Sequence, residues 1–244
     1  MVVAFALLAA VPAISPQRFG IGYDGRVALA KNSAHGNVIV ATNADVITVN
    51  EDGLTLSNSV AGAGGGGSAV AISDDGTFGA VGSHGGEVEV FKFDSEGYGV
   101  ATSLSGGSNS FGVSLSLSGN GSVLVVGAPG LYSPFADVYE WNGSEHVFRS
   151  THSGAADSLF GVSVSVSADG SRFVVGAPKL NNNECKVRVY EYNASAGGTA
   201  QLGEPLSVSG TPSLGRGVRM SSDGNAVLAT SWHDTYQSEW NGAA

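Results

Sequence analysis

Charged residues are scarce in this sequence, and basic residues are the scarcest. Only 13% of the 244 residues are charged, and 11 Lys and Arg stand against 21 Asp and Glu, which gives a formal net charge of −10. A chain of this charge repels the phosphate backbone of nucleic acids and the anionic surface of membranes. We therefore expect no nucleic-acid partner and no membrane insertion of the mature chain.

Cysteine and histidine are also rare. The single cysteine, Cys185, excludes an intramolecular disulfide and a zinc cluster built from cysteines. The five histidines are scattered singly, without the spacing that places two metal ligands on one face. We assign Cys185 no role and predict neither a metal site nor another cofactor.

Long hydrophobic runs are missing except at the N-terminus, where the run from Val2 to Val11 is followed by small residues. No other apolar segment approaches the roughly 20 residues that span a bilayer. Residues 1–17 fit two interpretations, a secretory signal peptide or a strand that closes the fold. The first predicts a secreted or cell-surface protein, and the second a cytoplasmic one.

Glycine, by contrast, is abundant, with 37 positions, and much of it recurs in a repeat. The segment "FGVSLSLSGNGSVLVVGAPG" at 111–130 returns as "FGVSVSVSADGSRFVVGAPK" at 160–179. Further copies place Gly76 and Gly224, and a looser copy places Gly36, at the position that Gly121 and Gly170 occupy in these two. A period of about 40 to 50 residues is typical of a repeat architecture in which each repeat is one structural unit.

Each unit has the pattern of a small antiparallel sheet. Alternating Ser and aliphatic residues predict a first strand, a turn such as "SADG" follows, and an unbroken apolar run predicts a second strand covered on both faces. Third strands are predicted at 86–93, 136–143, 186–195 and 235–242, and fourth strands at 146–154 and 201–210.

Four-stranded units of this kind are typical of propeller blades, which must stack because no blade covers both its own faces. We predict an all-β propeller over 18–244 with about five blades, four full and one partial, or a piece of a larger propeller. The predicted units are 26–65, 66–110, 111–159, 160–213 and 214–244.

The pairing of Phe111-Gly112 with Gly127-Ala128-Pro129, repeated at 160–161 and 176–178, resembles the FG-GAP repeats of integrin α-subunit propellers. The resemblance implies a cell-adhesion or other binding protein. Blades of that family often hold calcium in a loop with several carboxylates. Here the turns offer only Asp74, Asp75, Asp169 and Asp223, so we interpret these residues as structural Asx turns and do not transfer the calcium role.

No catalytic motif is present: the sequence has no GxSxG elbow, and the glycine-rich run at 61–69 lacks the lysine of a phosphate loop. An enzyme remains the alternative hypothesis, because several blades of a propeller can contribute to one site at the mouth of its channel. His84, His233 and Asp234 are the residues we expect at such a hydrolase or lyase site.

The longest insertions follow the two Gly-Ala-Pro motifs and should emerge at the same edge of the propeller. Loops on a rigid scaffold commonly carry recognition. We therefore predict a non-catalytic binding scaffold that recognises a protein or glycan ligand through Tyr132, Phe135, Asn181, Asn182 and Asn183. Asn120, Asn142 and Asn193 begin Asn-x-Ser sequons and are the predicted glycosylation positions if the chain is exported.

Overall fold

The computed structural model of this chain describes an all-β protein. The described residues are 19–20, 28–29, 45–50, 53–59, 67–83, 85–94, 97–108, 110–178, 186–193, 198–207 and 213–231. Three predicted features lie outside these residues. They are the signal peptide or closing strand at 1–17, the third strand at 235–242, and all but the last residue of the insertion at 179–186.

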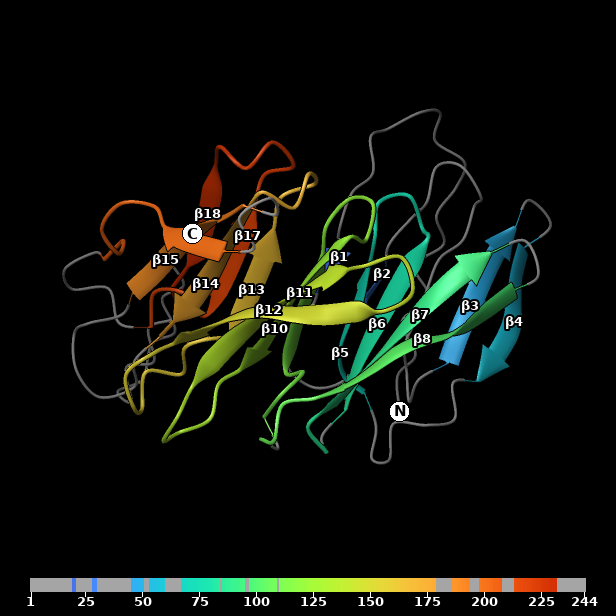
Figure 1. Cartoon of the computed structure of the whole chain (residues 1–244), viewed down its shortest axis with the longest axis horizontal. Helices are drawn as coiled ribbons and strands as arrows, with labels where there is room; N and C mark the ends of the chain where they lie inside the picture. The colour runs from blue at the N-terminus through green and yellow to red at the C-terminus, as the bar shows by residue number, and fades with distance from the viewer. Residues whose placement is uncertain are drawn as a thin grey trace, which may run out of the picture.

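Three four-stranded antiparallel sheets form the centre of the described structure, and their strands pair in chain order. They follow one another across the molecule in the order of the sequence (Figure 1). Their strands are β5 (Gly67–Ile72), β6 (Phe78–Ser83), β7 (Glu87–Asp94) and β8 (Gly97–Ser105); β9 (Ser114–Leu117), β10 (Val123–Ala128), β11 (Phe135–Trp141) and β12 (His146–Ser153); β13 (Ser163–Val166), β14 (Arg172–Ala177), β15 (Lys186–Asn193) and β16 (Gly198–Gln201).

Three two-stranded sheets complete the described structure. They pair β1 (Phe19–Gly20) with β2 (Ala28–Leu29), β3 (Asp45–Asn50) with β4 (Gly53–Ser59), and β17 (Gly217–Met220) with β18 (Val227–Thr230). The prediction of an all-β fold built from four-stranded, blade-like sheets is confirmed. The unit boundaries, and with them the number of blades, stay a prediction.

The turn between the first and second strands of a sheet is built from one recurring set of hydrogen bonds. In the β13–β14 turn, the Ser167 hydroxyl donates to Asp169 Oδ1 (2.6 Å) and accepts from the Arg172 amide (3.0 Å). Gly170 follows with φ of 74°, a conformation that favours glycine. Asp75 and Asp223 occupy the same position in their turns. The Asx turns predicted at Asp75, Asp169 and Asp223 are confirmed, while the one at Asp74 stays a prediction.

The serines of the first strands join neighbouring sheets. Ser116 in β9 accepts a hydrogen bond from the Val166 amide of β13 (3.1 Å), and Ser165 in β13 accepts one from the Met220 amide of β17 (3.0 Å). The small serine side chains let the sheets approach closely. They also supply hydrogen-bond acceptors to backbone amides that lie outside each sheet's own ladder.

The repeated Phe-Gly and Gly-Ala-Pro motifs meet at the contact between one sheet and the next. The Gly161 amide donates to the Gly176 carbonyl within its own unit (3.0 Å). On the other side, the Gly161 carbonyl lies against the α-carbon of Gly127, where a side chain would clash with it. Gly161 itself has φ of 87°. The repeated motifs therefore contain glycine at these positions, because three backbone segments approach one another there and leave no room for a Cβ.

The hydrophobic core lies between the sheets. All six residues of β10 are buried, as the unbroken apolar run predicts. Phe111 packs in the layer between the β5–β8 and β9–β12 sheets, and Phe160 packs in the next layer, between β9–β12 and β13–β16. In the following unit Leu214 takes the place of this phenylalanine and is also buried.

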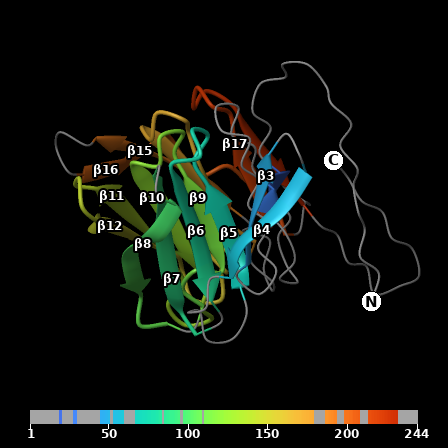
Figure 2. The ribbon, with the colours of Figure 1, turned by 90° about the vertical axis from the view of Figure 1, so that its right-hand side faces the viewer.

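The fourth strands lie on the side of the molecule away from β5 and β17 (Figure 2). The strand predicted at 146–154 is confirmed by β12. The one predicted at 201–210 is wrong in its bounds, because β16 covers Gly198–Gln201 and pairing then resumes only at Leu206, opposite Val187. Among the described residues no helix has the length and apolar character needed to cross a membrane.

Candidate ligand pocket on the β9–β12 sheet

The loop between β10 and β11 presents the predicted binding residues to solvent. Tyr132 is 88% exposed, and Leu131 beside it is also exposed. Phe135 begins β11 and is half-buried. Asn181, Asn182 and Asn183 lie outside the described residues, so their part in a common rim stays a prediction.

The loop after β12 holds this exposed loop in place. The Asp157 amide donates to the Leu131 carbonyl (2.6 Å), and the Gly154 amide donates to the Pro134 carbonyl (2.9 Å). Asp157 has φ of 61°, a left-handed conformation that is uncommon for a residue other than glycine. Two loops that are distant in the sequence thus share one edge of the molecule.

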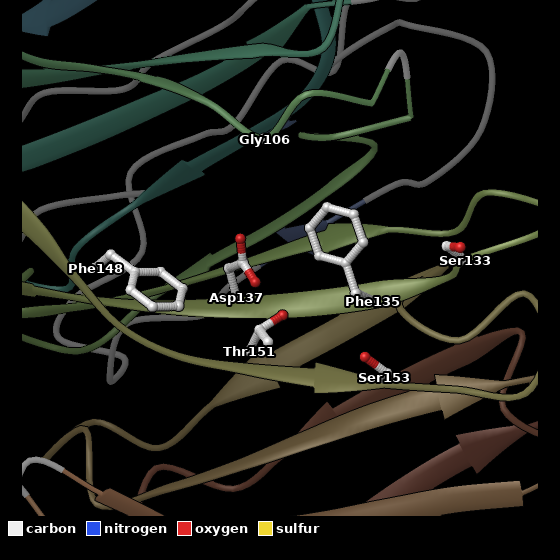
Figure 3. A pocket seen from close by; sticks show the side chains of 7 residues that line it. All are labelled: Gly106, Ser133, Phe135, Asp137, Phe148, Thr151 and Ser153. Atoms are coloured by element: carbon white, nitrogen blue, oxygen red, sulfur yellow. The ribbon is translucent and has the colours of Figure 1, made fainter.

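A cavity of about 330 Å³ opens directly below the exposed loop. It lies on the face of the β9–β12 sheet that is turned toward the β5–β8 sheet. Figure 3 shows the carboxyl group of Asp137 between the rings of Phe135 and Phe148. The lining residues are Gly106, Ser133, Phe135, Asp137, Phe148, Thr151 and Ser153.

Strand register explains why these side chains gather on one face. In β11, Phe135, Asp137 and Tyr139 alternate with residues of the opposite face. Asp137 is paired with Thr151 of β12, and Tyr139 is paired with Phe148. A β-bulge next to Tyr139 inserts one extra residue in β12, so that Thr151 and Phe148 both point into the cavity although three positions separate them.

Asp137 is the unusual residue of the pocket. It is only 7% exposed, and its Oδ1 has no hydrogen-bond partner among the described residues. Its Oδ2 accepts a long hydrogen bond from the Tyr139 hydroxyl (3.4 Å). Burial raises the pKa of the Asp137 carboxyl, and the hydroxyls of Thr151 and Tyr139 act in the opposite direction. A buried carboxyl with one free oxygen is costly for the fold unless something pairs with it.

Aromatic rings surround this carboxyl. Phe135 stacks on Phe111 with ring centroids 6.3 Å apart, Phe111 meets the edge of Tyr139 at 6.4 Å, and Tyr139 meets Phe148 at 5.9 Å. Phe148 is more than half exposed although it is a large apolar residue. Apolar walls with a few converging polar groups are typical of a ligand pocket.

The described histidines belong to other parts of the structure. His146 is buried between sheets, where its Nε2 lies 2.8 Å from the Gly121 carbonyl oxygen, and its ring packs against Phe78 and Trp141. Burial lowers the pKa of His146, and of His152 in the next layer. His84, His233 and Asp234, the residues predicted for an enzyme site, lie outside the described residues.

The predicted glycosylation positions are all on the surface. Asn120 and Asn142 are exposed in turns, where each side-chain oxygen accepts the amide hydrogen of the residue two positions later. Asn193 is exposed at the end of β15. Their glycosylation stays a prediction. Among the described residues no group of three or more His, Cys, Asp or Glu is arranged to hold a metal ion.

Sequence reasoning missed Asp137. The segment "ADVYEWNG" at 136–143 is predicted only as an aromatic third strand, and the first of its two acidic residues, Asp137, is given no role. The signal was present, because Asp137 falls on the same face as Phe135 and Tyr139, where alternation demands an apolar residue.

Comparison with known proteins places the chain among β-propellers by structure alone. No family model matches the sequence, and no curated protein matches it. A protein from Lactobacillus plantarum superposes with a TM-score of 0.59 at 14% identity, over 98% of this chain and 72% of that protein. The hydrazine synthase of Kuenenia stuttgartiensis superposes with a TM-score of 0.55 at 17% identity, over 84% of this chain and 58% of that one.

A third similar structure is a candidate 6-phosphogluconolactonase from Bacteroides fragilis, with a TM-score of 0.51 and 15% identity over 80% of this chain. This chain spans only 56% of that protein's length. The structural similarity is to seven-bladed propellers. At these identities the similarity establishes the propeller fold and leaves the function of this chain open.

Proposed function

We propose that this chain is a non-catalytic recognition module of the FG-GAP type, secreted or displayed at the cell surface, which binds a protein or glycan ligand at the edge formed by the loop before β11. The observation that carries the proposal is the cavity beneath this loop. It combines the exposed ring of Phe148 and the half-buried ring of Phe135 with a buried carboxyl oxygen that has no partner in the described structure.

Several features support binding in preference to a purely structural role. Tyr132 and Leu131 are large, exposed and next to the cavity, and aromatic residues such as Tyr132 are enriched at recognition sites. The cavity also offers the hydroxyls of Ser133, Thr151 and Ser153. A ligand with one apolar face and several hydrogen-bonding groups would satisfy both sets of side chains.

The experiment is a binding screen on purified protein, against an array of surface glycans and a panel of extracellular proteins. Tyr132→Ala and Phe135→Leu should each weaken a genuine interaction at least tenfold, because each removes contact area at the edge of the cavity. Leu228→Ala is the matched control, since Leu228 is 68% exposed but lies on β18. It should bind like the unaltered protein.

Two results would count against the proposal. One is a ligand whose affinity is unchanged in both edge variants, which would place recognition elsewhere. The other is turnover in a broad hydrolase and lyase screen, run with and without chelator. Turnover that Asp137→Asn abolishes would favour a propeller enzyme with a site in this cavity.

A further inference from the structure

The three four-stranded sheets place different residues at the position that Asp137 occupies. Each of these residues pairs with the residue immediately before the glycine of the second strand: Glu89 with Val81, Asp137 with Val126, and Arg188 with Val175. The backbone environment of the position is repeated while the charge of its side chain changes.

In the β13–β16 sheet a basic residue, Arg188, occupies this position. The guanidinium carbon of Arg188 lies 5.5 Å from the ring centroid of Phe160, and its Nη1 donates to the Ser153 carbonyl of the preceding sheet (3.4 Å). Phe160 is the phenylalanine of the Phe-Gly motif, so Phe111 is its counterpart beside Asp137. The architecture therefore accommodates a basic side chain over this phenylalanine.

In the β9–β12 sheet the side chain at the same position, that of Asp137, is short and acidic. Asp137 lines the cavity of about 330 Å³, whereas the equivalent position of the next sheet carries the much longer side chain of Arg188. Its Oδ1 is buried without a hydrogen-bond partner, and no cationic side chain pairs with it among the described residues. The nearby Arg149 is bound to Glu140, with 2.8 Å between its Nε and Oε2.

We infer that the cavity receives a basic side chain of a partner protein, an arginine or lysine, whose cationic group pairs with Asp137 and lies between Phe135 and Phe148. This inference rests on the proposed function and names the chemistry of the ligand. The aliphatic stem of such a side chain suits the phenyl walls, and its charge suits the carboxylate.

The other ligand chemistries fit less well. A divalent cation requires several oxygen ligands, and the cavity offers a single carboxylate. A neutral hydroxyl would satisfy the free oxygen but would leave the buried charge uncompensated. A formal net charge of −10 also attracts basic partners over a distance. An amino sugar also carries a cationic group, but it lacks a long aliphatic chain like that of Arg188, which the equivalent position of the next sheet accommodates.

The test is a titration of the folded chain followed by amide NMR, with a short capped peptide of Gly and Ser around a central arginine. The same peptide with citrulline is the neutral probe of equal shape. We expect saturable shifts for the arginine peptide at Gly106, Ser133, Phe135 and Phe148, and at least tenfold weaker binding of the citrulline peptide.

Variants separate the pocket from the rest of the acidic surface. Asp137→Asn should weaken arginine binding about tenfold or more while keeping the fold. Glu89→Gln removes one negative charge at the equivalent position of the preceding sheet and should leave the affinity unchanged. Asp137→Arg should fill the cavity as Arg188 fills its own position, and should abolish binding without unfolding the protein.

The outcomes distinguish the inference from the proposed function. The inference would be overturned if the arginine and citrulline peptides bound with equal affinity, or if neither peptide bound. If Tyr132→Ala still weakened a ligand found in the screen, the proposed function would stand. Tighter binding of a glucosamine oligosaccharide than of the arginine peptide would overturn the assignment to a protein partner.

Discussion

At the residue scale, single glycines decide whether neighbouring sheets can approach. A Cβ added at Gly127 would collide with the carbonyl oxygen of Gly161 and with the hydroxyl of Ser114. Both atoms are held by the fold, because the Ser114 hydroxyl donates to that same carbonyl (2.7 Å). The contact cannot relax by turning a flexible side chain, so the backbones themselves would have to separate.

Gly127→Ala should therefore destabilise the protein by about 2 to 4 kcal/mol, as overpacking in a rigid core does. The measurement is the free energy of unfolding from urea titration. Gly99→Ala is the control, because nothing lies within 4 Å of a Cβ at that position. A loss in Gly127→Ala no larger than in the control would show that the sheets are not in close contact there.

His146 makes a second prediction at this scale. Burial lowers its pKa below the ordinary value, while the unfolded chain has a pKa near 6.5. The unfolded state therefore takes up a proton below about pH 6.5 that the folded state resists, and stability falls as the pH drops. His152 contributes in the same direction.

Thermal unfolding between pH 7.5 and 5 tests this, because those limits lie about 1 unit above and about 1.5 units below the ordinary pKa. The melting temperature should decrease below about pH 6.5. His146→Phe, which keeps an aromatic ring packed against Phe78 and Trp141, should show a shallower decrease. Identical pH profiles of the two proteins would mean that His146 is not the group responsible.

At the element scale, each first hairpin depends on a serine whose hydroxyl is used twice. Ser167 is fully buried and connects Asp169 to the Arg172 amide. Replacing it by alanine leaves that amide without its acceptor and frees the Asp169 carboxylate from one donor. Unsatisfied buried groups cost more than the hydrogen bond itself contributes.

Ser167→Ala should cost about 1 to 3 kcal/mol of unfolding free energy. Ser171→Ala is the control, since the Ser171 hydroxyl only donates to the exposed Asp169 Oδ2 (2.8 Å). It should cost a few tenths of a kcal/mol, in the range of surface substitutions. Equal effects of the two variants would contradict the role given to Ser167.

The elements were also what the sequence predicted best. The alternation of Ser and aliphatic residues, the turns and the apolar second strands gave β9, β10, β13 and β14 because each signal is local. The fourth strand β16 was placed wrongly because its pairing with β15 is interrupted, and an interruption of that kind leaves no periodic pattern. The bulge beside Tyr139 was invisible for the same reason, although it shapes the cavity.

At the scale of the whole molecule, the cavity depends on a relation between sheets that no single repeat contains. Tyr132 and Phe135 could be predicted as loop and edge residues from their position after Gly-Ala-Pro. That Asp137 faces a cavity follows only when Gly106 of the preceding sheet is placed opposite it. That Asp137 and Arg188 occupy equivalent positions can be recognised only when the pairing of β11 with β10 is aligned with that of β15 with β14.

The buried carboxyl of Asp137 lowers the stability of the unliganded fold, and the same carboxyl is the group proposed to bind the ligand. Burial raises the pKa of Asp137, so the folded state disfavours its charged form. Stability that is present below the ordinary pKa of a carboxyl is therefore lost as the pH rises through the folded pKa. At neutral pH the unliganded protein carries this cost, and a cationic partner would relieve it.

Asp137→Asn removes the charge and keeps the shape of the side chain, so it should raise the unfolding free energy at pH 7 by about 1 kcal/mol. For a chain of this size that corresponds to roughly 2 to 4 °C in melting temperature. The gain should disappear near pH 3.5, below the ordinary carboxyl pKa of about 3.9, where the aspartate is protonated in both states. Glu89→Gln serves as the control and should show no comparable gain. A variant that melts lower than the unaltered protein at pH 7 would mean that Asp137 is already paired in the unliganded fold, which is the arrangement that leaves no place for a partner's cation.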